Sequence, residues 1–181
     1  MHSRWVHIPS GRKIKILISE EEIAKKVVSV ATDLNIQFKD RELIIVTILK
    51  GAICFVADLI RHLEFPFQLE FVSAASYGMR GTKPGELNLS GFEKLDLEGK
   101  DILLVDDIYD TGKTLSTAFH VIETKQPKSL QTLVLLRKKV DHVGNILPDR
   151  VCFDIGDHFV IGYGLDYKEH FRGLKEICIN P

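Results

Sequence analysis

The sequence predicts an α/β fold in which a central, mostly parallel sheet is flanked by helices, with a small hood near the carboxyl terminus. Strand-like and helix-like segments alternate along the chain, which is the order that βαβ units produce. The segment 43–49 is apolar on both faces, as expected of a central strand buried between two helix layers. The 181 residues contain no Pro/Gly/Ser-rich linker, so residues 1–181 are expected to form one domain.

The first half of the chain carries signals for two helices and two strands. Ser19 and Glu22 have the spacing of a capping box, in which each side chain bonds to the backbone of the other residue. Apolar residues then recur at helical spacing, and the acidic first turn suits the helix dipole. The expected elements are a helix over 19–35, a strand over 43–49, a helix over 52–63 and a strand over 67–74.

A long segment without sustained periodicity follows, from about residue 76 to residue 90. It contains three glycines, one proline and several charged residues. One hypothesis is a mobile lid, because long segments that leave a strand beside an active site often close over it; the alternative is a plain surface loop. Further strands are expected over 103–105, 130–136, 151–153 and 159–162, the last two within a hood over about 137–181.

The most informative motif begins where the strand over 103–105 runs into Asp106 and Asp107. It continues through Asp110 to the run Thr111-Gly112-Lys113-Thr114. Backbone N–H groups of such a turn, at the start of a helix, can bind one phosphate, and the helix dipole adds to the attraction. Two carboxylates beside a phosphate would repel it unless they bind ribose hydroxyls or face a divalent cation. The motif therefore predicts a sugar-phosphate site.

Two other interpretations explain part of this motif. A nucleotide-binding P-loop requires a glycine five residues before its Gly-Lys-Thr sequence, but that position is Asp107, whose charge would face the bound anion. The other interpretation is an acidic turn followed by a helix N-cap at Asp110 or Thr111.

Polar residues also follow other predicted strands. Lys50 comes directly after the strand over 43–49, and Ser76 lies near the end of the strand over 67–74. Ligands of parallel sheets bind beyond the carboxyl ends of the strands. Lys50, Ser76 and Asp106 are therefore expected to meet in one site.

Composition argues against several classes of partner. The chain has 24 basic and 25 acidic residues and a net charge of −1, which provides no general attraction to nucleic acid or to an anionic membrane. Three widely spaced cysteines without a Cys-x-x-Cys motif are typical of thiols in a reducing compartment. Residues 1–7 lack the apolar run of a secretory signal, and no later run reaches membrane-spanning length. A cytoplasmic protein with small-molecule partners is expected.

The segment 103–114 closely resembles the phosphoribosyl-pyrophosphate signature of the type I phosphoribosyltransferases. From Lys15 to about Cys178 the order of features is similar to that of the hypoxanthine-guanine phosphoribosyltransferases. The matching features are Leu49-Lys50-Gly51, Ser76-Tyr77, Lys138 and the segment 159–167. The resemblance implies the type I phosphoribosyltransferase fold, Mg²⁺ as cofactor, and a homodimer or homotetramer. It also implies purine salvage, in which phosphoribosyl pyrophosphate and hypoxanthine or guanine give IMP or GMP and pyrophosphate.

The resemblance further implies a role for each matching residue on the phosphoribosyl side. The residues that would bind the 5′-phosphate are Thr111, Gly112, Lys113 and Thr114. Asp106 and Asp107 would hold the ribose hydroxyls, directly or through Mg²⁺, and Asp166 would bind a second Mg²⁺. Lys50 and Gly51 would contact pyrophosphate through the loop backbone, and Arg172 would bind it as well. The resemblance also implies a cis peptide between Leu49 and Lys50. Ser76 and Tyr77 would help to shield the reacting atoms from water.

On the purine side the resemblance implies four further contacts. Asp110 would take the proton from the purine imidazole ring, or would only hydrogen-bond and orient that ring. Lys138 would donate to the exocyclic oxygen of a 6-oxopurine, a contact that the amino group of adenine does not satisfy. Phe159 would stack on the purine, and the backbone of Val160 would bind its edge; ordinary strand packing is the alternative for both.

The sequence also departs from the family pattern. The lid sequence over 79–84 lacks the usual small residues, and Arg137 and Lys139 flank Lys138 where an acid and a proline are more familiar. An alternative in another class is a phosphoribosyltransferase-like regulator that binds phosphoribosyl pyrophosphate and nucleic acid without catalysis. A pyrimidine-operon attenuator with uracil phosphoribosyl transfer is its nearest form. Asp110, Lys138, Phe159 and the near-neutral charge argue against the regulator, and the purine segment from Phe159 to Asp166 argues against the attenuator.

Overall fold

The computed structural model describes residues 5–7, 13–76, 87–141 and 143–180. A six-stranded sheet has the strand order β5-β4-β3-β6-β7-β8. Every neighbouring pair is parallel except β4 and β5, which are antiparallel. The strands are β3 (Leu43–Leu49), β4 (Phe67–Ser76), β5 (Leu87–Ser90), β6 (Asp101–Tyr109), β7 (Ser129–Lys138) and β8 (Arg150–Ile155). The predicted α/β class with a mostly parallel central sheet is confirmed.

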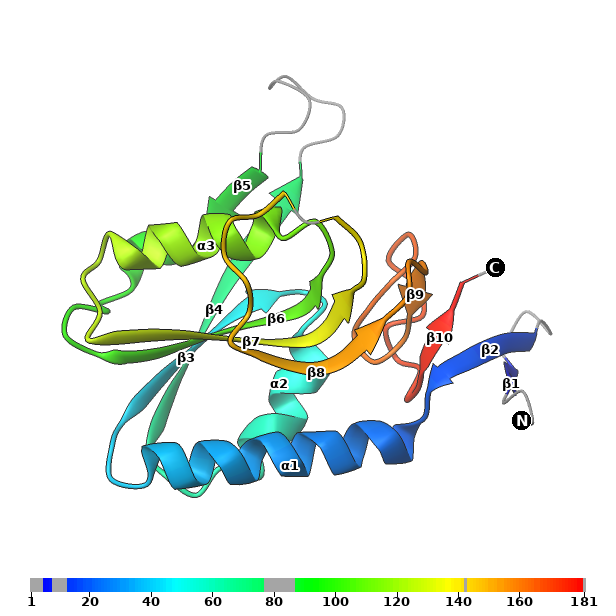
Figure 1. Ribbon diagram of the computed structural model, residues 1–181, viewed down its shortest axis with the longest axis horizontal. Coiled ribbons are helices and arrows are strands. Elements are labelled where there is room, and N and C mark those ends of the chain that lie inside the picture. Colours follow the sequence, from blue (N-terminus) through cyan, green and yellow to red (C-terminus); the bar gives the residue numbers. More distant parts are fainter. Residues whose placement is uncertain (1–4, 8–12, 77–86, 142, 181) are drawn as a thin grey trace.

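Helices cover both faces of this sheet (Figure 1). The helices α1 (Glu20–Phe38) and α2 (Ile53–Ile60) lie on one face, and α3 (Lys113–Glu123) lies on the other. The predicted capping box at the start of α1 is present, because Ser19 accepts from the Glu22 N–H while the Glu22 carboxylate accepts from the Ser19 N–H. The helix runs three residues beyond the expected end, whereas α2 stops three residues short of its own.

The apolar core is divided by the sheet into two clusters. One lies between the sheet and α1 and α2, and includes Leu34, Phe55 and Leu103. The other lies under α3 and includes Leu104 and Leu115. Burying a side chain of this size stabilises the fold by about 1.5–3 kcal/mol. Both faces of β3 and β6 are covered, which explains why these strands are apolar at successive positions.

A smaller antiparallel sheet lies beside the main one, with the order β1-β2-β10-β9. Its strands are β1 (Trp5–His7), β2 (Lys13–Ile18), β9 (Val160–Ile161) and β10 (Ile177–Ile179). Figure 1 shows the two ends of the chain meeting in this sheet. The hood expected over about 137–181 thus also takes strands from the amino terminus, because β2 supplies the pairing edge for β10.

Three sequence expectations need correction. The strand predicted at 151–153 is not part of the hood, because β8 pairs in parallel with β7 in the main sheet. The expected loop over 76–90 is shorter, since its last residues form β5 and pair with β4, and a short 3-10 helix (Phe92–Lys94) follows. The strand expected over 103–105 continues to Tyr109, so the acid pair lies within β6. The proposed lid over 77–86 lies outside the described residues.

Within the described part of the chain, no helix has both the length and the apolar character needed to cross a membrane.

Candidate active site

A cavity of about 620 Å³ lies at the carboxyl ends of β3, β4 and β6. Its wall also includes the first turn of α3 and the loop that follows β9. Lys50 and Asp106 both line it, as the strand-end argument predicted. Ser76 ends β4, but its side chain is not among those the structure describes, and Tyr77 lies outside the described residues.

The phosphate loop (residues 111–114) forms one side of this cavity. Gly112 is the N-cap of α3, and its φ of +81° lies in the left-handed region that favours glycine. A methyl group at this position would lie 2.6 Å from the Tyr109 hydroxyl oxygen, so space also demands glycine. The first turn of α3 lines the cavity, and N–H groups at a helix start can bind an anion; Gly112 offers them no side-chain cap, and the Lys113 N–H lies 3.5 Å from the Thr111 hydroxyl oxygen.

A short segment, the strap (residues 143–146), braces the phosphate loop from behind. The N–H groups of Val143 and Gly144 both donate to the Thr111 carbonyl oxygen, at 2.9 and 3.0 Å. The Tyr109 hydroxyl donates to the Ile146 carbonyl oxygen at 2.8 Å, and the Ile146 N–H donates to the Ser116 hydroxyl at 3.3 Å. These bonds tie the loop between β7 and β8 to the amino end of α3, and the sequence held no signal for them.

Asp106 and Asp107 lie side by side at the end of β6. Burial, followed by the charge of Asp107, raises the pKa of Asp106 well above its usual value. Burial also raises the pKa of Asp107, although hydrogen bonds and the Arg172 charge oppose this. A Cβ on Gly51 would lie 1.5 Å from the Asp107 carboxylate oxygen, so glycine lets the loop after β3 pack against this acid. The pair is an oxygen-rich site that a cation or hydroxyl donors would stabilise.

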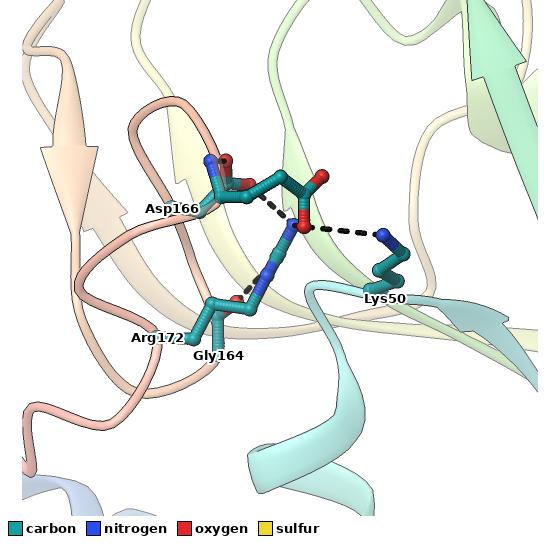
Figure 2. Close-up of polar contacts among 5 residues, drawn as sticks. Lys50, Gly164, Asp166 and Arg172 are labelled. Atoms are coloured by element: carbon teal, nitrogen blue, oxygen red, sulfur yellow. Dashed lines mark hydrogen bonds and ion pairs between the residues drawn. The ribbon is translucent and has the colours of Figure 1, made fainter.

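An ionic cluster, drawn in Figure 2, forms another part of the cavity wall. The Arg172 guanidinium pairs with Asp166 at 2.7 Å and with Glu169 at 3.2 Å, and donates to the Gly164 carbonyl oxygen at 2.8 Å. Glu169 also accepts from the Lys50 ammonium at 3.1 Å. The hydrogen bonds from Lys50 and Arg172 lower the pKa of Glu169. The peptide between Leu49 and Lys50 is cis, as the resemblance implied.

Asp110 links the cavity to a second group of residues. Its carboxylate lies 2.9 Å from the ammonium of Lys138, the last residue of β7. The same ammonium lies 3.5 Å from the Asp157 carboxylate. The Lys138 side chain is only 11% exposed, whereas that of Asp110 is 47% exposed. Phe159 is half-exposed, and its ring meets Tyr167 edge to face at 5.8 Å. Val160 is buried in β9.

The structure therefore gathers most of the predicted residues. The ones that line the cavity are Lys50, Gly51, Asp106, Asp107, Asp110, Thr111, Gly112, Lys113, Thr114, Asp166 and Arg172. Lys138, Phe159 and Val160 do not line it, although Lys138 joins it through Asp110. Sequence reasoning assigned no role to Glu169, Asp157 or Tyr109, because their contacts come from residues distant in the chain.

Residues 15–168 match the family described as the phosphoribosyl transferase domain. The chain belongs to this family. The match includes the strand ends, the acid pair and the phosphate loop, and it ends one residue before Glu169, so Glu169 and Arg172 of the cavity wall lie beyond it.

Relatives with named functions align over nearly the whole chain. The hypoxanthine-guanine phosphoribosyltransferase of Bacillus subtilis is 39% identical over 165 residues, which are 91% of this chain and 92% of that protein. The crystal structure of a hypoxanthine-guanine phosphoribosyltransferase from Bacillus anthracis superposes with a TM-score of 0.84 at 33% identity, covering 94% of this chain and 100% of that one. The hypoxanthine phosphoribosyltransferase of Trypanosoma cruzi in complex with the product IMP gives 0.82 at 36% identity, covering 91% and 92%.

Proposed function

We propose that this protein acts in purine salvage, transferring the phosphoribosyl group of phosphoribosyl pyrophosphate to hypoxanthine or guanine. The products are IMP or GMP and pyrophosphate. The observation that carries the proposal is one cavity with a phosphate loop, an acid pair and a cationic wall, joined through Asp110 to the buried ammonium of Lys138. Each part suits one part of the two substrates, and relatives with this named activity match more than 90% of the chain.

The phosphate loop and the acid pair would hold the ribose 5-phosphate. First-turn N–H groups of α3 would bind the 5′-phosphate, with Thr111 and Thr114 offering hydroxyl groups. Asp106 and Asp107 would accept hydrogen bonds from the ribose hydroxyls. Burial raises the pKa of both acids, which means that burial disfavours their charged forms. Hydrogen bonds from the ribose hydroxyls would stabilise these charged forms.

Asp106 and Asp107 also fit Mg²⁺, which takes carboxylate oxygens together with water and substrate phosphates. Among the described residues, no group of three or more His, Cys, Asp or Glu side chains could hold a metal by itself. Water and substrate oxygens would complete the coordination. When bound, Mg²⁺ would neutralise charge that develops on the leaving pyrophosphate. Asp166 would help to hold a second ion, and its two oxygens also accept from Arg172 and from the Glu169 N–H.

The pyrophosphate end would lie against Lys50, the Gly51 backbone and Arg172. Two cations from segments far apart in the chain stabilise the negative charge that leaves with pyrophosphate. The transition state should resemble an oxocarbenium ion, which water would trap, so the site must close. We assign this closure to Ser76, Tyr77 and the residues that follow them up to β5.

The purine would bind between Phe159 and the pair formed by Asp110 and Lys138. Asp110 would accept the proton that the imidazole ring loses as the glycosidic bond forms. Lys138 would donate to the 6-oxo group, and Asp157 would help to hold its ammonium. Adenine would leave Lys138 without an acceptor on the purine. Losing one such bond costs about 1–3 kcal/mol, which is roughly tenfold to hundredfold discrimination against adenine. Phe159 would stack on the ring, and Val160 would bind its edge through the backbone.

Location and assembly are further parts of the proposal. The described cysteines, Cys54, Cys152 and Cys178, are all free thiols, which supports a cytoplasmic location. We expect a homodimer or a homotetramer.

The test is pyrophosphate release with Mg²⁺ and phosphoribosyl pyrophosphate, measured in parallel with hypoxanthine, guanine, xanthine, adenine and uracil. We expect turnover with hypoxanthine or guanine and little with adenine or uracil. Lys138→Met should lower kcat/KM for hypoxanthine by about tenfold to hundredfold. Lys139→Met, which changes the exposed neighbour, is the matched control. Binding of phosphoribosyl pyrophosphate without turnover on any base would instead indicate a sensor.

A further inference from the structure

One carboxylate is shared by Lys50 and Arg172, the two cations proposed to bind pyrophosphate. Glu169 lies 3.1 Å from the Lys50 ammonium and 3.2 Å from the Arg172 guanidinium. Among the described residues it is the only carboxylate paired with both cations. Lys50 follows β3 and Arg172 follows β9, so Glu169 joins two distant segments across the cavity.

The backbone at Glu169 is unusual for this residue type. Lys168 and Glu169 have φ values of 51° and 65°, and the backbones of Tyr167 and His170 exchange hydrogen bonds in both directions. These are the features of a type I′ turn, whose central positions strongly favour glycine, asparagine or aspartate. Glycine would fit this turn with less strain. A glutamate at this strained position indicates a functional role for its side chain.

The charges indicate what that task is. Pyrophosphate would need the same ammonium and guanidinium groups that Glu169 now contacts, and two anions cannot occupy one place between them. The Glu169 side chain is 65% exposed and can turn into solvent. Arg172 is only 23% exposed and would keep its contacts with Asp166 and Gly164. Displacement of Glu169 therefore leaves the guanidinium oriented toward the cavity.

We propose that Glu169 is a resident counter-ion of the pyrophosphate site. Its carboxylate pairs with Lys50 and Arg172, leaves when pyrophosphate binds, and returns as pyrophosphate departs. This inference rests on the proposed function. It adds a residue that lowers the affinity of the enzyme for the product pyrophosphate. Glu169 thereby favours product release over tight binding.

The experiment is calorimetric titration of the full chain with pyrophosphate in the presence of Mg²⁺. The variants are Glu169→Gln, which keeps the shape without the charge, and Glu169→Gly, which removes the side chain and suits the turn. Glu98→Gln changes an exposed carboxylate near the opposite end of β6 and is the matched control. Titration with IMP reports on the same site without the pyrophosphate contacts.

We expect Glu169→Gln to bind pyrophosphate about threefold to tenfold more tightly than the unchanged protein, and Glu169→Gly at least as tightly as Glu169→Gln. Affinity for IMP should stay the same in all variants. Unchanged or weaker pyrophosphate binding by both Glu169 variants, with normal IMP binding, would overturn the counter-ion role alone. An unchanged protein that binds neither ligand would overturn the proposed function itself.

Discussion

Removing the Tyr109 hydroxyl tests whether the strap positions the phosphate loop. Tyr109→Phe deletes the donor to the Ile146 carbonyl oxygen and keeps the ring, which is 1% exposed and packed in the core under α3. The strap would retain its two bonds to Thr111 and its bond to Ser116. The substitution therefore weakens the brace without removing it.

The size of the effect follows from this one bond. A neutral hydrogen bond of this kind contributes about 1 kcal/mol, and the Ile146 carbonyl is in a half-buried residue that water can partly reach. For a chain of this length, about 1 kcal/mol lowers Tm by about 2–4 °C. If the same free energy is lost from binding, the KM for phosphoribosyl pyrophosphate rises by up to about fivefold.

Thermal unfolding and steady-state kinetics measure the two effects separately. Tyr163→Phe is the matched control, because it deletes a bond of 2.7 Å to the Asp58 carboxylate on α2, away from the phosphate loop. This control should lose at least as much stability, since bonds to charged acceptors are worth about 1.5–3 kcal/mol. Its KM should stay the same. An unchanged KM in Tyr109→Phe, or an equal rise in both variants, would refute the positioning role of the strap.

Three further predictions concern the acids and the loop beside them. Asp110→Asn should lose at least about tenfold in turnover while still binding phosphoribosyl pyrophosphate, and near-normal turnover would remove Asp110 from the role of base. Asp106→Asn should be more stable than the unchanged protein, by a margin that grows as pH rises, and thermal unfolding measures this difference. The folded pKa of Asp106 is raised above its usual 3.8, so its contribution is complete below that value and is lost as pH passes the raised pKa; a constant difference across pH would contradict this. Gly51→Ala should lower kcat/KM by at least about tenfold, because its methyl group would displace the Asp107 carboxylate, and wild-type kinetics would show that the loop yields without cost.

Local patterns were sufficient for most of the fold. The capping box located the start of α1, and the apolar run over 43–49 located a central strand. Element ends were less predictable, since β6 continues through its acids and α2 ends at Ile60, before the helical periodicity of the sequence does. The strand at 151–153 was assigned to the hood because a short apolar segment carries no information about which sheet it will join. Pairing with β7 decides that question.

The candidate site, like the fold, was determined partly by local sequence and partly by tertiary contacts. By itself the sequence determined the chemistry of the phosphate loop, because N–H groups, a helix start and two acids lie within one short segment. It also indicated that Lys50 and Asp106 would meet, since parallel strands end at one edge. Only the tertiary structure decided that Glu169 would bridge Lys50 and Arg172, that Lys138 would pair with Asp110, and that the strap would brace Thr111. Such contacts join residues far apart in the chain, and their geometry exists only after the sheet and hood have packed.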